Sequence, residues 1–309
     1  MGRLINGKWV KTSIVTSDES GKYDRLKRTF LDEISKDGEF KPEKGRYHLY
    51  VSLACPWAHR TLIYREFKQL QNIISVSVVH PDMLDFGWYF DDSFPGATKD
   101  HVNNNDYLFQ NYQLAQSNVT TSVTVPILWD KKKHKIVNNE SSHIIRFFND
   151  QFNDLTNNGL DLYPLNLQDE INHFNEITYE SINNGVYKCG FAKNQNSYDL
   201  AVTTLFNALD RLDVHLKDRN YLVGDQLTEA DIRLIPTLLR FDAVYFTHFK
   251  CNIKRIKDYS NLFRYMKNLY ELEEIRKTTN FDHIKRHYFF SHEMINPYRI
   301  IPKGPSDFI

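Results

Sequence analysis

The stretch that decides the fold runs from residue 46 to residue 60 and reads Arg-Tyr-His-Leu-Tyr-Val-Ser-Leu-Ala-Cys-Pro-Trp-Ala-His-Arg. The β-branched and aromatic residues at 46–52 predict a strand, and a helical pattern follows over residues 56–70. Between them lie Cys55 and Pro56. Proline suits the first position of a helix, because the N–H that it lacks would have no partner there. The sequence therefore predicts a thiol at the start of a helix, just beyond the end of a strand.

The position of the Cys55 thiol indicates a reactive group. Unpaired backbone N–H groups and the positive end of the helix dipole stabilise a thiolate relative to a thiol, and the thiolate is the nucleophile. Position 58 is alanine, so the motif is not the Cys-x-x-Cys of a dithiol. A single thiol cannot resolve its own mixed disulfide, so turnover requires an external thiol. The alternative is a buried structural cysteine followed by an incidental proline.

Composition excludes several classes of protein. The 309 residues are enough for two domains, and 39 basic residues balance 39 acidic ones, which argues against a binder of nucleic acid or of a membrane surface. The three cysteines are too few and too scattered for a disulfide framework, so a reducing compartment is expected. Neither a signal peptide nor a run of 18 apolar residues is present, and we expect a cytoplasmic protein.

Outward from Cys55, the pattern continues as a βαβ unit and then a hairpin. Residues 73–80 predict a second strand, parallel to the first, whereas residues 81–122 read as a long loop. Order returns over residues 123–130, where Val125 precedes Pro126, and a short strand at residues 136–137 leads into a helix that ends near Phe148. On spacing alone, the Val125–Pro126 bond is equally well read as cis or as the trans bond of an edge strand.

The rest of the chain has helical periodicity. Residues 1–45 read as an irregular arm with at most short helices, and residues 151–165 as a linker. Thr228 and Asp231 predict a capping box at a helix start. One apolar stripe repeats at intervals of four and three residues: Tyr198, Val202, Leu205, Leu209, Leu212 and Leu216. We expect Cys189 and Cys251 to be inert apolar residues in helical segments.

These motifs together resemble those of the glutathionyl-hydroquinone reductases, the xi-class glutathione transferases, over roughly residues 1–304. The motifs that carry the resemblance occur in family order: Cys55-Pro-Trp-Ala58, Phe86-Gly-Trp88, Val123-Thr-Val-Pro126, Asn138-Asn-Glu-Ser141, Ile182-Asn-Asn-Gly-Val-Tyr187, Thr228-Glu-Ala-Asp231, Arg240-Phe-Asp-Ala-Val-Tyr245, His248-Phe-Lys-Cys251, Asn280-Phe-Asp-His283 and His287-Tyr288. The resemblance implies an α/β thioredoxin-like N-terminal domain at 46–150, after the arm, and an all-α C-terminal domain with a tail at 166–309, the glutathione transferase architecture.

The resemblance also implies roles for individual residues. Glutathione, as co-substrate, would bind to Trp88 and to a cis Val125–Pro126 turn, with Glu140 on its γ-glutamyl ammonium and Ser141 on its carboxylate. Cys55 would be the nucleophile. The catalytic tyrosines Tyr187, Tyr245 and Tyr288 would line an aromatic pocket that binds the hydroquinone and protonates it as it leaves. Plain helix capping, packing of the loop on the core and ordinary tyrosine packing are the structural alternatives.

One position departs from the family. Members often carry an arginine just before the Val-Thr-Val-Pro strand, where it pairs with the glutathione carboxylate, and this chain has Ser122 there. Arg46 or Arg60 could compensate. His283 and His287 are four residues apart, but they lack the glutamate of a His-Glu-x-x-His site, and we expect no metal.

We therefore expect a homodimeric enzyme that binds glutathione and aromatic glutathionyl conjugates and reduces S-glutathionyl-hydroquinones through a Cys55–glutathione mixed disulfide. The first alternative is an omega-like thioltransferase or dehydroascorbate reductase, which would not require the tyrosine pocket. The second is a non-enzymatic glutathione-binding regulatory protein, a class that usually lacks the nucleophile. A conjugating transferase is disfavoured, because a cysteine would trap glutathione as a disulfide.

Overall fold

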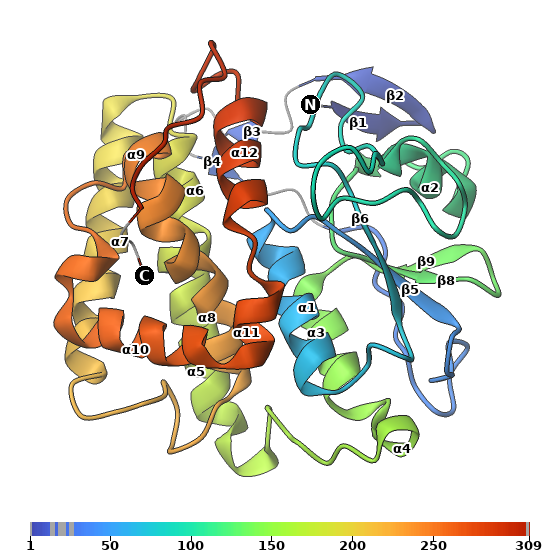
Figure 1. Ribbon diagram of the computed structural model, residues 1–309, viewed down its shortest axis with the longest axis horizontal. Helices are drawn as coiled ribbons and strands as arrows, with labels where there is room; N and C mark the ends of the chain where they lie inside the picture. The colour runs from blue at the N-terminus through green and yellow to red at the C-terminus, as the bar shows by residue number, and fades with distance from the viewer. Residues whose placement is uncertain (1, 13–15, 18–22, 25–27, 307–308) are drawn as a thin grey trace. The chain divides into compact units, whose positions relative to one another are not determined.

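The computed structural model describes residues 2–12, 16–17, 23–24, 28–306 and 309, which form two compact units (Figure 1). The first unit contains the described residues of 1–14, 26–160 and 278–291, and the second contains those of 15–25, 161–277 and 292–309. Residues 278–291, which the sequence prediction grouped with the helical domain, thus make their contacts within the first unit. The predicted domain boundaries otherwise stay predictions.

A four-stranded mixed sheet forms the centre of the first unit. Its strands are β5 (Tyr47–Val51), β6 (Ser75–Val78), β8 (Ile127–Asp130) and β9 (Lys135–Asn138), in the order β6-β5-β8-β9. β6 runs parallel to β5, whereas β8 and β9 are antiparallel to their neighbours. All five residues of β5 are buried, as expected of a central strand. The predicted βαβ unit and the hairpin after it are confirmed.

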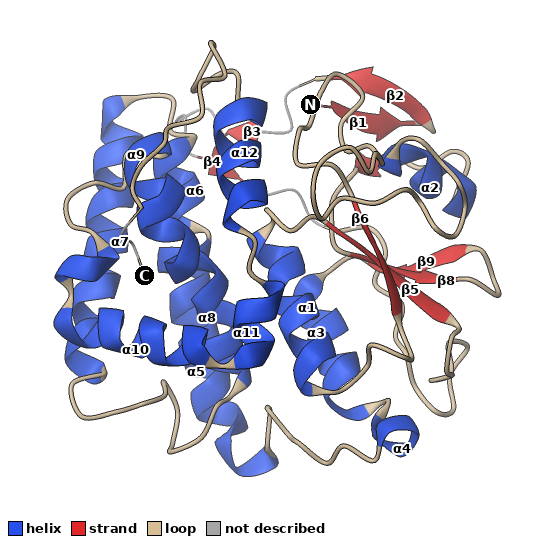
Figure 2. Cartoon of the chain, in the orientation of Figure 1, coloured by secondary structure: helices blue, strands red, loops and turns tan. Residues whose placement is uncertain are grey.

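Two helices that contact each other accompany this sheet, α1 (Pro56–Phe67) and α3 (Ser141–Asp150) (Figure 2). The short helix α4 (Asn153–Thr156) follows them. α1 buries Pro56 through Tyr64, and α3 buries the apolar face that contains Ile144, Ile145 and Phe148. Burial of these faces holds the starts of both helices in place. Cys55 precedes α1 and Glu140 precedes α3.

The N-terminal region contains a hairpin, so the prediction of an irregular arm with at most short helices is wrong for residues 2–11. β1 (Gly2–Ile5) pairs with β2 (Lys8–Lys11), and β7 (Thr121–Ser122) joins β1 on its other side. The turn residues Asn6 and Gly7 have φ values of 47° and 73°. Asn-Gly is the preferred pair for such a turn, and this local signal could have revealed the hairpin.

The segment at residues 81–122 is also more ordered than predicted, because it contains α2 (Leu108–Ala115). Its asparagines do not form a flexible loop. The Asp100 carboxylate accepts hydrogen bonds from the Tyr50 hydroxyl at 2.9 Å and the Asn111 amide at 3.1 Å. The Asn111 side-chain oxygen in turn accepts bonds from Asn103 and Asn105, both at 2.8 Å. A satisfied polar network therefore fixes the backbone where apolar periodicity is missing.

Helix α12 (Phe281–Ser291) is fastened to the start of that same segment. Arg286 donates two hydrogen bonds to Asp82, at 2.6 and 2.7 Å. The backbone N–H of Met83 donates to the Ser291 hydroxyl at 2.9 Å. His287 Nδ1 lies 2.8 Å from the carbonyl oxygen of Pro81. These side-chain contacts explain why α12 belongs to the first unit.

The second unit is mainly helical, apart from the strand pair β3 (Thr16–Ser17) and β4 (Tyr23–Asp24). Its helices are α5 (Gln168–Thr178), α6 (Gly185–Gly190), α7 (Gln195–His215), α8 (Glu229–Arg240), α9 (Phe246–His248), α10 (Ser260–Glu271) and α11 (Glu273–Thr278), the last ending at the unit boundary. Its shorter turns are the π-helical η2 (Tyr179–Asn183) and η3 (Phe241–Tyr245) and the 3-10 turns η1 (Leu165–Leu167) and η4 (Ile256–Asp258).

Two predictions for this unit are confirmed and one is wrong. The predicted stripe lies along α7, where Val202, Leu205, Leu209 and Leu212 are buried. The Thr228–Asp231 capping box begins α8. Cys251, however, follows α9 rather than lying in a helix. Among the described residues, no helix combines the length and apolar character needed to cross a bilayer.

Candidate active site

Cys55 occupies the N-cap position of α1, as predicted. Its backbone is extended, with φ −77° and ψ 121°, and Pro56 is the first helical residue. The side chain is half-buried, and its Sγ lies 3.6 Å from the carbonyl oxygen of Val125. Cys55 therefore lies at a helix start with its sulfur beside the turn that precedes β8. This is the location that the sequence predicted for a reactive thiol.

The Val125–Pro126 peptide bond is cis, which confirms the prediction made from the resemblance. β8 begins at Ile127, so Val125 lies just outside the sheet. No described residue accepts a hydrogen bond from the Val125 N–H. Although Val125 is buried, an extended peptide could pair with the unpaired N–H on this edge of backbone. The sulfur of a cysteinyl unit bound there would then lie close to Cys55.

Glu140 and Ser141 mark the start of α3. Glu140 is the N-cap and accepts a hydrogen bond of 3.0 Å from the Ser142 N–H, while its second oxygen lies 3.8 Å from Arg28 Nε. Burial opposes ionisation of Glu140, but the Ser142 hydrogen bonds and the charges of Arg28 and Arg60 lower the pKa of its carboxyl below the usual value. Capping is thus shown for one oxygen. Binding of a γ-glutamyl group by Glu140 and Ser141 stays a prediction.

Trp88 is more enclosed than a tryptophan exposed on a surface loop would be. Only 7% of it is exposed, and its ring stacks on the His287 imidazole with centroids 4.7 Å apart and planes at 25°. The sequence did not single out His287 as the partner of Trp88. The sequence analysis used His283 and His287 to weigh a metal site and as parts of two family motifs, without assigning either a partner. A role of Trp88 in covering glutathione stays a prediction.

Tyr288, on α12, is the predicted pocket tyrosine that belongs to the same unit as Cys55. It is 2% exposed and follows directly after His287. Because Arg286 and His287 are both bonded to the segment that starts at Pro81, the helix turn that carries Tyr288 is held by its neighbours in sequence. The position of Tyr288 therefore depends on the same contacts that support Trp88.

Tyr187 and Tyr245 lie together in the second unit. Their ring centroids are 6.1 Å apart, and Tyr245 stacks on Phe249 at 5.4 Å with an interplanar angle of 14°. Phe249 also contacts the ring of Phe191 at 5.2 Å. Tyr187 is half-buried, whereas Tyr245 is fully buried. The structure thus brings two of the three predicted tyrosines into one aromatic cluster.

Each of these two tyrosines is next to a π-helical turn. η2 ends shortly before α6, which carries Tyr187, and Tyr245 is the last residue of η3. Such insertions change the direction of the side chains that follow, and they are frequent at functional sites. Nothing in the apolar periodicity of the sequence marks them.

Gly190 is a second requirement of the aromatic cluster that the sequence did not reveal. A Cβ built at this position would lie 2.3 Å from ring carbons of Phe249. The absence of a side chain at Gly190 is therefore what allows Phe249 to reach its place under Tyr245. The only local sign of this role is that Gly190 follows closely after the motif that ends at Tyr187.

The suggested compensation for Ser122 does not hold for Arg46. Arg46 is 8% exposed and donates through its Nε to the Asp130 carboxylate at 2.9 Å. This bond raises the pKa of the Arg46 guanidinium, because the positive charge is stabilised by its buried partner. Arg60 is 1% exposed and lies over the Trp57 ring at 4.8 Å. Arg46 therefore has a structural partner already.

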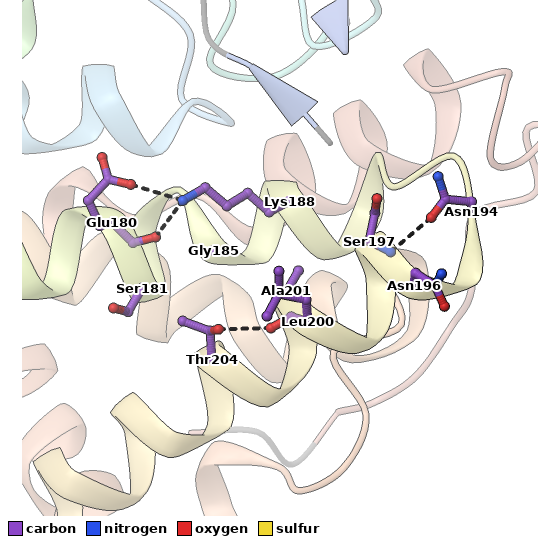
Figure 3. Close-up of a pocket in the computed structure, with 10 residues that line it drawn as sticks. All are labelled: Glu180, Ser181, Gly185, Lys188, Asn194, Asn196, Ser197, Leu200, Ala201 and Thr204. Atoms are coloured by element: carbon purple, nitrogen blue, oxygen red, sulfur yellow. Dashed lines mark hydrogen bonds and ion pairs between the residues drawn. The ribbon is translucent and has the colours of Figure 1, made fainter. Parts of the chain in front are cut away.

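The second unit also contains a cavity of about 490 Å³ between η2, α6 and α7 (Figure 3). Lys188 crosses part of its wall and pairs with Glu180 at 2.9 Å. The lining is mixed, with Leu200 and Ala201 beside serine and asparagine side chains, and none of the predicted site residues contributes to it. Within the described ranges, no group of three or more His, Cys, Asp or Glu side chains is arranged to hold a metal ion.

Comparison with known proteins adds to this geometry. Models of the glutathione S-transferase N-terminal and C-terminal domains match residues 54–151 and 195–268. The glutathionyl-hydroquinone reductase YqjG of Escherichia coli is 52% identical and covers 99% of this chain and 95% of that protein. PcpF of Sphingobium chlorophenolicum, with the same designation, is 47% identical over 99% of this chain and 97% of its own. The omega-like glutathione S-transferase 2 of Schizosaccharomyces pombe is 46% identical over 94% and 95%.

Solved structures give the same result. The xi glutathione transferase of Phanerochaete chrysosporium superposes with a TM-score of 0.93 at 50% identity, covering 95% of this chain and 96% of that one. The glutathione-bound structure of the Escherichia coli relative superposes with a TM-score of 0.91 at 50% identity, covering 98% and 96%.

Proposed function

This chain belongs to the glutathionyl-hydroquinone reductases, the xi class of the glutathione transferases, and from that membership we propose that it reduces S-glutathionyl-hydroquinones with glutathione as the electron donor. The observation that carries the proposal is the position of Cys55 at the start of α1, with Sγ 3.6 Å from the carbonyl of Val125 in a cis turn. A glutathionyl group paired with Val125 would bring its sulfur to the nucleophile.

The proposed reaction has two steps. In the first, the Cys55 thiolate attacks the sulfur of the conjugate, and the carbon–sulfur bond breaks. The bonding electron pair stays on the ring carbon, which takes a proton from a pocket tyrosine, so the hydroquinone leaves and a Cys55–glutathione disulfide remains. In the second step, a glutathione thiolate attacks that disulfide and releases oxidised glutathione. The net change consumes one conjugate and one glutathione and yields one hydroquinone and one glutathione disulfide.

The residues have separate tasks in this scheme. Val125 would align the cysteinyl unit, while Glu140 and Ser141 would bind the γ-glutamyl end at the start of α3. Tyr187 and Tyr245 would contribute aromatic faces and hydroxyl groups for the hydroquinone. Cys55 would be the nucleophile in the first step and the leaving group in the second. Trp88, Pro126 and Tyr288 would complete the binding of the conjugate.

One alternative is supported by a specific finding, since the Schizosaccharomyces pombe relative is designated omega-like. An omega-like thioltransferase or dehydroascorbate reductase would use Cys55 in the same way and leave the tyrosines without a chemical task. A non-enzymatic glutathione-binding regulator would bind glutathione without any turnover. The intact Cys55 argues against that second alternative.

A stoichiometric assay tests the proposal. The protein is mixed with a glutathionyl-hydroquinone and excess glutathione, and the released hydroquinone and glutathione disulfide are both quantified. We expect equal amounts of the two products and a kcat/KM well above the values for dehydroascorbate and for a small glutathione mixed disulfide. Faster turnover of either comparison substrate would support the omega-like alternative, and binding without turnover would support the regulator.

The finer expectations about partners and place follow from this function. Aromatic glutathionyl conjugates are the substrate class, and a compartment that supplies glutathione, such as the cytoplasm, suits the second step of the reaction. A homodimer is expected from the family, and sedimentation velocity would check it.

A further inference from the structure

The proposed glutathione site lacks an obvious partner for one end of the ligand, and this inference rests on the proposed function. Glutathione carries a carboxylate at its γ-glutamyl end and another at its glycyl end. The first is assigned above to the start of α3. Ser122, on the strand that leads to Val125, supplies no positive charge for the second. Arg46, one of the two arginines suggested from the sequence, is bonded to Asp130.

The N-terminal hairpin brings another guanidinium to this position. β1 lies between β2 and β7, and Arg3 of β1 is directly opposite Ser122 of β7 in the antiparallel register. Residues directly opposite each other in such a pair project from the same face of the sheet. The burial pattern agrees, because Gly2 and Leu4 are buried whereas Arg3 is only half-buried. Arg3 thus shares a face with the position that lacks a charge.

The Arg3 guanidinium has no anionic partner within the described part of the chain. Its Nε is enclosed and has no hydrogen-bond partner there. By contrast, Arg46 is bonded to Asp130, and Arg286 to Asp82. An enclosed N–H without an acceptor is costly, so such a group in a native protein calls for an explanation. A ligand carboxylate would supply the missing acceptor.

The hairpin is held firmly enough to present Arg3. The Gly7 N–H donates to the Val119 carbonyl at 2.8 Å, and the Asn6 N–H donates to the Thr120 hydroxyl at 2.9 Å. On β2, the Trp9 indole N–H donates to the Asp85 carbonyl at 3.0 Å. These bonds attach the hairpin to the segments that lead to Val125 and to Trp88. The backbone of Arg3 is therefore fixed relative to both of those proposed glutathione contacts.

We propose that Arg3 binds the glycyl carboxylate of glutathione in place of a charge at Ser122. Three residues of extended chain, about 10 Å, separate Ser122 from Val125. One glycyl residue of the ligand spans about 3.5 Å of this interval, and the long arginine side chain covers the remainder. The planar guanidinium can donate two parallel hydrogen bonds to a carboxylate, the geometry for which arginine is best suited.

Calorimetric binding of two ligands tests this proposal. Glutathione and its glycyl ethyl ester, which lacks the charge in question, are titrated into the wild-type protein, Arg3→Ala and the control Lys8→Ala, an exposed change on the other strand of the hairpin. We expect the wild type and Lys8→Ala to bind the ester about 10- to 100-fold more weakly than glutathione. Arg3→Ala should bind both ligands with the same weak affinity, and adding Ser122→Arg to it should restore the preference for glutathione.

The proposal is overturned if Arg3→Ala binds glutathione as tightly as the wild type, or if it still discriminates against the ester. If Arg3→Ala melts early, Arg3→Gln makes the same comparison with the stem and a donor retained. This binding result is independent of the reaction. If Arg3→Ala loses glutathione affinity but the wild type never reduces a conjugate, only the proposed function is refuted. If the wild type is active and Arg3→Ala binds glutathione normally, only the role of Arg3 is refuted.

Discussion

The two units position their proposed functional residues by different means. In the first unit, Cys55, Val125 and Glu140 stand at the ends of elements, where backbone geometry decides the direction of each side chain. In the second unit, Tyr187 and Tyr245 are placed by ring packing around Phe249, next to π-helical turns. The proposed chemistry of the first unit would thus depend on single atoms at defined positions, whereas the aromatic cluster of the second unit depends on volume and shape.

The difference teaches what each unit tolerates. A residue at an element end can be exchanged without disturbing the core, so its loss should affect activity more than stability. A ring in a close-packed cluster is supported from several sides, so a change of volume should affect stability and activity together.

The largest expected effect is that of Cys55→Ala. Removing the nucleophile should reduce turnover of glutathionyl-hydroquinones by about 1,000-fold or more, because the motif contains no second thiol to replace it. The melting temperature should change little. Cys189→Ala and Cys251→Ala are the controls and should retain most of the activity, since both thiols are buried in the second unit, where burial and the neighbouring Cys189 raise the pKa of Cys251. A Cys55→Ala protein that kept more than about a tenth of the rate would contradict covalent catalysis.

Gly190→Ala tests the packing of the aromatic cluster around Phe249 by adding one methyl group. The new Cβ would lie 2.3 Å from the Phe249 ring, so the packing of this ring, which stacks on Tyr245, must be disturbed. We expect a loss of about 1–3 kcal/mol of unfolding free energy, measured by urea denaturation, together with a higher KM for the conjugate. Gly159→Ala is a matched control, because a Cβ there would meet no atom within 4 Å. Equal stability of the two variants would show that the aromatic cluster is not close-packed.

Tyrosine-to-phenylalanine changes separate hydroxyl chemistry from ring packing. Tyr187→Phe, Tyr245→Phe and Tyr288→Phe each keep the ring. At least one should lose about 1–3 kcal/mol of transition-state binding, or about 5- to 150-fold in kcat/KM for the conjugate, with little change for a small glutathione mixed disulfide. Tyr198→Phe, whose hydroxyl donates to the Lys250 carbonyl at 2.7 Å, serves as a control. Identical behaviour of all variants on both substrates would make the tyrosines packing residues and favour a general thioltransferase.

The smallest effect concerns acid stability of the sheet. Burial lowers the pKa of His48 on β5 from 6.5 to about 3, and its ring nitrogens lie 2.7 Å from the Ser75 hydroxyl and 2.9 Å from that of Ser77. The unfolded chain therefore takes up a proton that the folded chain refuses. The contribution of His48 to the free energy of unfolding is fully present above pH 6.5 and is lost as the pH falls toward 3. The loss between pH 7 and pH 5 should be about 1–2 kcal/mol. His48→Gln should remove this part of the slope, and an unchanged slope would mean that other groups cause it.

The sequence predicted the first unit better than the second because element ends have local signals. Cys55-Pro56 identified the start of α1, whereas the cis turn at Val125–Pro126 was predicted from the family resemblance, because spacing alone left the bond open. The hairpin at residues 2–11 was missed, although the Asn6-Gly7 pair is a strong local predictor of a hairpin turn. α2 was hidden because a network around Asp100, rather than apolar periodicity, holds its surroundings. The π-helical turns before α6 and at Tyr245, the role of Gly190 and the stacking of His287 on Trp88 depend on contacts distant in sequence, which no short window reveals.

The central claim, that Cys55 takes the glutathionyl group directly from the conjugate, is tested most directly by mass spectrometry of the protein after one equivalent of glutathionyl-hydroquinone without added glutathione. The account predicts one glutathione on the peptide that contains Cys55, an equal amount of released hydroquinone, and loss of the adduct with formation of glutathione disulfide once glutathione is added. Release of hydroquinone with Cys55 unmodified, or attachment of the aromatic ring to Cys55, would contradict it.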